Sequence, residues 1–316
     1  MKRPSESQMR ARVTLLLAFL VAIAALAAAA CGGSDDTVVS SPRATASPSV
    51  AAPERLVGTD SVAVTKEVID AFGAGLEALS GARVAPLYAD EVVYDDFTYG
   101  LHLEGKKAVL KELRRSLGQA TGVRVLAGYA GRGWGVLEHR WDFTEVHGVS
   151  IQPLTVCEIS DGKIAYEAWW YQDPVDLPDG TPPEPKPLTA PPGPQDTAAA
   201  AEAVALEYAA ALQAKDAEEV AALSAADIAF MDTSTGTVAG SPAEVQAHYA
   251  QLFKAPTDLA FTDLRSVSGP GWATVIWSTG RSQPTFGDGV TMLEIRDDKI
   301  ARETLYYTGG GVPFGM

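Results

Sequence analysis

The sequence predicts an α+β protein with two tandem cone-shaped domains, each made of three helices packed on a curved antiparallel sheet. Three observations support this prediction. The chain repeats itself at an offset of 136 residues, as in Leu87 and Leu223; each copy starts with helix-period segments and ends with strand-period segments; and a proline-rich segment separates the copies. A chain of 316 residues has room for two domains, and its hydrophobic fraction of 47% excludes a disordered protein.

The first thirty residues predict an export signal. Four basic residues precede an apolar run from Val13 to Ala30, and Cys31 follows with small and acidic residues. A basic head, an apolar middle and a small-residue end are typical of a secretory signal. The segment around Cys31 resembles the lipobox of bacterial lipoproteins. That resemblance implies a signal peptide over 1–30, a lipid on Cys31, and a location on the extracytoplasmic face of the cell membrane. Cleavage after Ala30 without a lipid, and an uncleaved anchor, remain alternatives, and all three export the globular part.

The net charge argues against a nucleic-acid partner. It is −15 for the whole chain, and residues 1–30 hold four basic residues and one acidic residue, so the remainder carries −18. Phosphate binding needs a basic surface. An acidic protein is also repelled by anionic lipids, so attachment to the membrane would depend on the lipid at Cys31.

Two segments without periodicity divide the chain. Residues 31–58 are rich in Ser, Ala, Thr and Pro and predict a flexible tether. Residues 174–195 contain nine prolines and predict an extended linker. The predicted domains are therefore 59–173 (copy 1) and 196–310 (copy 2).

Each copy shows the same order of predicted elements. A first helix carries apolar residues four apart, at Val64, Val68, Phe72 and Leu76 in copy 1 and at Val204, Tyr208 and Leu212 in copy 2. A short second helix ends near Leu87 or Leu223. The first strand follows, over Val92–Phe97 or Ile228–Asp232.

A third helix and four strands complete each copy. In copy 2 this helix opens with Ser241 as N-cap, Pro242 and a capping Glu244. In the later strands of copy 1, Leu137, His139 and Trp141 alternate with charged residues, which is a period of two. The last two strands are joined by tight turns at 160–162 and 296–298.

These residues resemble the nuclear transport factor 2-like superfamily, and within it the SnoaL-like and ketosteroid-isomerase-like branch. The resemblance rests on the segments 87–96 and 161–164 in copy 1, and on 208–212, Asp216 and Asp232 in copy 2. It implies a cone-shaped fold that hosts enzymes, binding modules and dimerisation domains alike.

The resemblance also implies catalytic positions. Asp96 and Asp232 fall where ketosteroid isomerases place a general base, and an Asp facing an apolar cone has a raised pKa. The oxyanion donor of the family corresponds to Tyr208 in copy 2 and to Phe72 in copy 1, and its second donor to Thr291 and Thr155. The incomplete sets argue against steroid isomerisation. The alternative is that each Asp caps the turn after its strand.

His139 is a further candidate, as the partner of Asp96 in an acid–base couple or as a hydrogen-bonded core residue. Trp277 takes its place in copy 2. We interpret Cys157, in an apolar run, as a small buried residue.

The predicted ligand pockets are lined mainly by aromatic side chains, which suit a small apolar ligand with a ring. The pocket candidates are Phe72, Tyr94, Trp134, Trp141, Thr155, Phe230, Trp272, Trp277 and Thr291. Alternatively, these residues fill the core or a sheet–sheet interface, formed within the chain or in a homodimer. The sequence has no phosphate loop and no metal-ligand spacing, so we expect neither cofactor nor metal.

Three functional hypotheses follow. The favoured one is a lipid-anchored extracytoplasmic protein whose two domains bind a small apolar ligand or a protein partner. The second is an exported isomerase, cyclase or dehydratase with a pocket Asp as base, and the third is a structural pseudo-dimer with filled cones. The sequence leaves open whether the protein is an enzyme.

Overall fold

The computed structural model describes residues 54–56, 58–143, 150–171, 184, 186–254, 261–278 and 289–307. The predicted signal peptide, Cys31, most of the tether and much of the linker lie outside the described residues. Within the described part of the chain, no helix is both long and apolar enough to cross a membrane.

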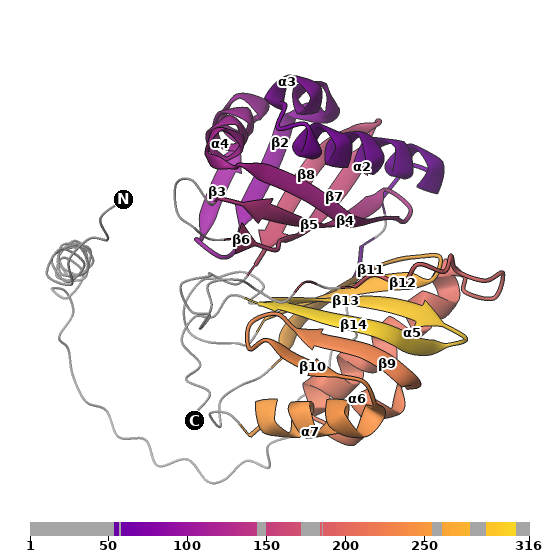
Figure 1. Ribbon diagram of the computed structural model, residues 1–316. Helices are drawn as coiled ribbons and strands as arrows, with labels where there is room; N and C mark the ends of the chain where they lie inside the picture. Colours follow the sequence, from indigo (N-terminus) through magenta and orange to yellow (C-terminus); the bar gives the residue numbers. More distant parts are fainter. Residues whose placement is uncertain are drawn as a thin grey trace, which may run out of the picture. The chain divides into compact units, whose positions relative to one another are not determined.

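Copy 1 folds as helices on one mixed sheet (Figure 1). The strand order is β3 (Leu101–Glu104), β2 (Tyr88–Asp96), β8 (Lys163–Trp170), β7 (Leu154–Ser160), β5 (Trp134–Asp142) and β4 (Gly122–Ala130), with β6 (Ser150–Ile151) on β5. The helices are α2 (Val62–Glu77), α3 (Gly81–Val84), the 3₁₀ turn η1 (Ala85–Leu87) and α4 (Lys106–Gln119).

Copy 2 repeats this arrangement. Its strand order is β1 (Glu54–Arg55), β11 (Thr262–Gly269), β12 (Trp272–Ser278), β13 (Gly289–Arg296), β14 (Lys299–Tyr307), β9 (Ser224–Asp232) and β10 (Thr237–Ala239). The helices are α5 (Ala198–Ala214), α6 (Ala217–Ala222) and α7 (Pro242–Leu252). The predicted fold class is confirmed.

In both copies, the pairing between the first and the last strand differs from the predicted antiparallel pattern. The first strand of each copy pairs in parallel with the last, β2 with β8 and β9 with β14. The third helix and all the other strands of the copy lie between these two strands in sequence, and a connection of that length allows parallel pairing. The parallel pair brings the ends of β2 and β9, with Asp96 and Asp232, beside the last strand.

The helix and turn signals in the sequence hold with one exception. Pro242 begins α7, but the Ser241 hydroxyl makes no cap to the helix; it donates to the Glu244 carboxylate at 3.0 Å, which also accepts from the Gly240 N–H at 2.8 Å. The tight turns are confirmed by positive φ angles, as at Asp161 (53°) and Asp297 (50°).

Each sheet is buried on both faces. The face toward the helices forms the core of its own copy, with Val68, Phe72 and Leu76 of α2 in copy 1 at their predicted spacing. The opposite face contributes to a third apolar cluster, which contains residues of both sheets. Because successive strand residues point to opposite faces, residue parity decides which cluster a side chain joins.

The strand β1 lies within the predicted tether but belongs to the second sheet. Glu54 and Arg55 pair in parallel with Arg265 and Ser266 of β11, and the Leu56 N–H donates to the Ser266 carbonyl at 3.0 Å. The segment that precedes copy 1 in the sequence therefore pairs with the sheet of copy 2.

Candidate functional site

Asp96 and Asp232 occupy the same duplicated setting at the ends of β2 and β9. One carboxylate oxygen of Asp96 accepts the N–H groups of Thr98 and Tyr99 at 3.0 and 3.2 Å, and the other accepts the Tyr171 hydroxyl at 3.0 Å. In copy 2 the N–H groups of Ser234 and Thr235 and the Tyr307 hydroxyl bind Asp232 in the same way. Each Asp therefore caps its turn.

The two settings differ in the neighbour contributed by the third helix. His248 of α7 places Nε2 at 3.2 Å from Oδ2 of Asp232, whereas Glu112 of α4 stands at the matching repeat position in copy 1. The third helix thus contributes a carboxylate near Asp96 in copy 1 and an imidazole beside Asp232 in copy 2. This contrast makes copy 2, and not copy 1, the candidate for acid–base chemistry.

The pKa values of the two Asp residues follow these neighbours. Burial raises the pKa of Asp96, against the hydrogen bonds from Tyr99, Tyr171 and Thr98, and Glu112 adds to the rise. Burial acts the same way on Asp232, but His248 outweighs it together with Ser234 and Tyr307, so the pKa of Asp232 lies below its usual value. The prediction of a raised pKa is right for Asp96 and wrong for Asp232, which is ionised at neutral pH.

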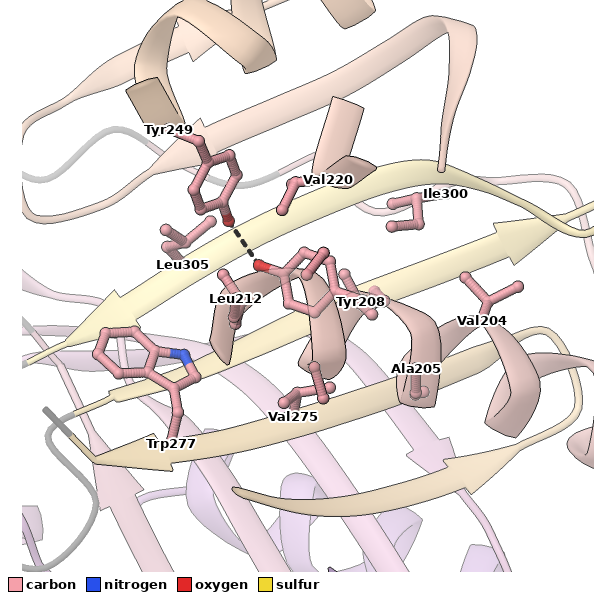
Figure 2. Close-up of a cluster of buried hydrophobic side chains, with 14 of the residues drawn as sticks. Val204, Ala205, Tyr208, Leu212, Val220, Tyr249, Val275, Trp277, Ile300 and Leu305 are labelled. Atoms are coloured by element: carbon pink, nitrogen blue, oxygen red, sulfur yellow. Dashed lines mark hydrogen bonds between the residues drawn. The ribbon is translucent and has the colours of Figure 1, made fainter. Parts of the chain in front are cut away.

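A second buried carboxyl, Glu303 of β14, lies in the core of copy 2. Its Oε1 accepts the hydroxyls of Tyr208, at 2.8 Å, and of Tyr249. Figure 2 shows these two tyrosines, from α5 and α7, pointing toward one another among apolar side chains. Among the described residues, Oε2 of Glu303 has no hydrogen-bond partner.

The cluster extends from Tyr208 to Thr291 and Trp277. The Tyr208 hydroxyl lies 3.3 Å from Oγ1 of Thr291, which also accepts the Trp277 indole N–H at 3.1 Å. The pKa of Glu303 is raised to about 7 by burial, although the two tyrosine hydroxyls lower it. Copy 2 thus holds two interior carboxyl groups whose proton affinities are pushed in opposite directions, a pattern found where one group gives and another takes a proton.

Copy 1 has a carboxyl at the same repeat position, but its partners are complete. Glu167 of β8 accepts the Tyr88 hydroxyl on one oxygen and the Trp169 indole N–H on the other. Burial raises its pKa to about 7. A recess of about 10 Å³ beside Tyr88 and Trp169 has room for about one water molecule.

His139 is a satisfied core residue. Its Nδ1 accepts the Trp141 indole N–H at 2.6 Å, and its Nε2 donates to Oγ1 of Thr155 at 2.7 Å. Burial lowers the pKa of His139 to about 3, so the ring is neutral. Neither hydrogen bond joins His139 to Asp96, and the suggested acid–base couple is not formed.

The predicted pocket residues separate into two groups. Those on the helix-facing side of the sheets or on α2 line the cores of their copies: Phe72, Tyr94, Trp141, Thr155, Phe230, Trp277 and Thr291. Trp134 and Trp272 instead lie in the cluster shared by the two sheets. Placing these two in the pockets was wrong, because Trp134 is an odd number of residues from Trp141 and so points to the opposite face of β5.

Two findings complete the description of candidate sites. No group of His, Cys, Asp or Glu among the described residues could hold a metal ion. Cys157 is fully buried, and burial raises the pKa of its thiol, which fits the predicted core residue. A surface groove of about 350 Å³ lies along α5 and α6, away from the Asp and Glu clusters.

Three residues of the copy 2 cluster were not predicted as site residues: His248, Tyr249 and Glu303. His248 is a single histidine on α7. The repeat offset carries a signal that could have found it, because it aligns His248 with Glu112 and Glu303 with Glu167.

Comparisons with known proteins agree with this architecture. Residues 205–303 match the family described as SnoaL-like domain, which spans nearly all of copy 2. Copy 2 is therefore similar to a SnoaL-like domain over residues 205–303. A comparison with curated proteins gives no match.

Several solved structures are similar to part of the chain. An NTF2-like protein of unknown function from Mesorhizobium loti has 16% identity and a TM-score of 0.33, covering 37% of this chain and 98% of its own. Another from Burkholderia xenovorans has 16% identity and a TM-score of 0.32, covering 41% and 88%. An LEH-like epoxide hydrolase of M. tuberculosis has 18% identity and a TM-score of 0.30, covering 35% and 84%.

Proposed function

We propose that this chain is an exported protein, held to the membrane by a lipid on Cys31, in which copy 2 binds a small ligand and copy 1 is its structural partner. The ligand has an apolar body with a ring and one hydroxyl or carbonyl group. The observation that carries this proposal is the unpaired oxygen of Glu303 in the interior of copy 2.

Buried polar atoms in folded proteins are nearly always hydrogen-bonded, so an unpaired one requires an explanation. Around Glu303 the polar groups of Tyr208 and Tyr249 already face Oε1. Oε2 is left to bind one further polar group. A ligand hydroxyl or carbonyl is suited to it, since a carboxyl with a pKa of about 7 can both donate and accept near neutral pH.

Copy 1 has no such spare capacity. Both oxygens of Glu167 and both ring nitrogens of His139 have partners, and the recess beside Tyr88 holds about 10 Å³. We therefore assign ligand binding to copy 2 alone.

The apolar part of the ligand would contact Phe230 and Trp277, which are 2% and 4% exposed. Both side chains are buried in the copy 2 core, and Phe230 lies opposite Glu303 in the pairing of β9 with β14, so binding requires at least one of them to move. Ligand binding therefore selects or induces a second arrangement of the copy 2 core. Because Trp277 donates to Thr291, movement of this ring would change its fluorescence.

A fluorescence titration tests the proposal. Steroid-like and polyketide-like compounds are titrated into the protein, with Trp277→Phe to assign the signal. We expect Glu303→Gln to weaken binding at least tenfold, while the matched Glu167→Gln variant in copy 1 binds as the wild type does. No response across the panel, or equal loss in both variants, would contradict ligand binding by copy 2.

The lipid anchor is tested separately. The basic and apolar segments before Cys31 and the net charge of −18 after residue 30 support it. We expect mass spectrometry of the mature N-terminus to find a lipidated Cys31 and Cys31→Ser to release the protein from membranes. An unmodified mature N-terminus would overturn the anchor and leave the proposal for copy 2 standing.

A second candidate function is proton transfer by Asp232. The pKa of Asp232, whose Oδ2 lies 3.2 Å from Nε2 of His248, is lowered, which keeps the carboxylate ionised as a general base requires, and Glu303 supplies a proton donor in the same core. Activity toward a carbonyl substrate should then fall at least a hundredfold in Asp232→Asn and be retained in Asp96→Asn. Activity that survives Asp232→Asn removes this residue from the mechanism.

A further inference from the structure

The faces of the two sheets that point away from the helices share one apolar cluster. Copy 1 contributes side chains of β5, β7 and β8, and copy 2 contributes side chains of β11 to β14. The pairs that meet include Tyr129 and Trp272, whose ring centroids are 5.8 Å apart. Apolar burial alone does not decide which copy pairs with which, because both copies carry a similar face.

A buried ionic group at this junction is asymmetric. Arg302 of β14 is 1% exposed, and its guanidinium donates to both oxygens of Glu138 on β5 and, at 2.6 Å, to Glu294 on β13. Glu138 also accepts the Tyr306 hydroxyl at 2.6 Å, and Tyr129 donates to Glu294 at 2.7 Å. One copy supplies the essential carboxylate and the other supplies the cation.

The repeat shows what a pairing of identical copies would lack. Arg302 corresponds to Tyr166 in copy 1, and Glu138 corresponds to Ile276 in copy 2 at the local offset of 138. Two copies of type 1 would bury Glu138 without a cation. Two copies of type 2 would leave Arg302 with Glu294 of its own copy but without the Glu138 carboxylate. An ionic group buried without its partner is strongly destabilising.

The backbone approaches closely at the same junction. A Cβ added at Gly131, in the turn between β4 and β5, would lie 2.4 Å from the carbonyl oxygen of Ser268 on β11. Only glycine permits this approach without a shift of one copy against the other. Gly118 on α4 provides a matched comparison, because an added Cβ there meets nothing within 4 Å.

We propose that Glu138 and Arg302 form a lock that reserves this face for the other copy of the same chain, so that the two copies unfold as one unit and the face forms no homodimer. The inference is independent of ligand binding. The linker supports it at both ends: Glu184 pairs with Arg124 in copy 1, and the Leu188 N–H donates to Glu294 in copy 2.

A charge exchange in the full chain tests the lock. Arg302→Glu and Glu138→Arg each leave like charges facing one another, whereas the double variant restores one cation between two carboxylates. We expect the wild type to unfold in one calorimetric transition and to sediment as a monomer. Each single variant should split or lower that transition and self-associate, and the double variant should recover the wild-type behaviour.

Two controls separate the lock from general damage. Exchange of the exposed pair Lys66 and Asp70 should leave the transition unchanged, and Gly131→Ala should lower it while Gly118→Ala does not. The proposal is overturned by a wild-type dimer that Arg302→Glu separates into monomers. Two independent transitions in the wild type, or a double variant no better than the single ones, would overturn it as well.

Discussion

The raised pKa of Glu303 makes a quantitative prediction about pH. In the folded protein this carboxyl titrates at about 7, against the usual value of 4.5, because it is buried. The folded state therefore holds its proton more tightly than the unfolded state. Between these two values the free energy of unfolding falls as the pH rises, since the unfolded chain is free to ionise and the folded one is not.

The size of the effect follows from the two pKa values. Each unit of difference corresponds to about 1.4 kcal/mol, and between pH 5 and pH 8 the free energy of unfolding should fall by about 2–3 kcal/mol for Glu303. Glu167 has the same raised pKa and contributes a similar amount, so the wild type should lose about 5 kcal/mol over this range from the two groups. The contribution of the two protonated carboxyl groups to the free energy of unfolding is largest at low pH and is fully lost above their folded pKa of about 7.

Glu303→Gln should remove the part of the pH dependence of stability that comes from Glu303 and leave the part that comes from Glu167. The amide oxygen can still accept the hydroxyls of Tyr208 and Tyr249, and the amide does not titrate. Urea unfolding at pH 5, 6, 7 and 8 should therefore show a slope about half that of the wild type. Glu167→Gln is the matched variant in copy 1 and should reduce the slope equally, and the double variant should keep only what other groups contribute, such as Asp96 with its raised pKa.

The absolute stability of Glu303→Gln is less informative than its slope, because the amide nitrogen replaces an oxygen that has no partner and costs about 1 kcal/mol or more. A wild-type free energy of unfolding that stays constant from pH 5 to pH 8 would refute the argument. So would a Glu303→Gln variant with an unchanged slope.

Three further predictions concern named contacts. The pKa of Asp232 is lowered, so its contribution to stability is present above about pH 4 and is lost as the pH falls through the folded pKa. Asp232→Asn should therefore cost about 1–3 kcal/mol at pH 7 and clearly less at pH 2.5 in urea unfolding, and an equal cost at both would contradict the lowered pKa of Asp232. Arg302→Met leaves Glu138 buried without its cation and should cost about 3–5 kcal/mol in thermal unfolding. Adding Glu138→Leu should recover most of this loss. A double variant whose losses are the sum of the two single losses would argue against the ionic group. Trp141→Phe removes the donor to His139 and should cost about 1 kcal/mol without any change in ligand binding, whereas a loss of binding would place the functional site in copy 1.

The repeat and the periodicity in the sequence were sufficient to predict the fold. Leu87 and Leu223 mark the same point in each copy, and the alternation around His139 identified a strand that the structure places as β5. The parallel pairing of β2 with β8 was not predicted, because it joins the two ends of a copy and leaves no local signal. The strand β1 was missed for a similar reason: its partner, β11, is far away in sequence.

The candidate site was predicted in part. Asp232 and Tyr208 were identified by their position, and the structure places both in the core of copy 2. His248 was not identified, although the repeat offset aligns it with Glu112, because its role depends on a distance to Asp232 that only the structure gives. Trp134 was assigned to the wrong face because its parity relative to Trp141 was not applied, although the sequence contained that information.

The most direct test of the central claim is a crystal structure of the protein with a ligand identified by the fluorescence titration. We predict that the ligand lies in copy 2, with its hydroxyl or carbonyl group within hydrogen-bond distance of Oε2 of Glu303 and with Trp277 or Phe230 displaced. A ligand bound in copy 1, or in the groove along α5 and α6 with the copy 2 core unchanged, would contradict the assignment of function to copy 2.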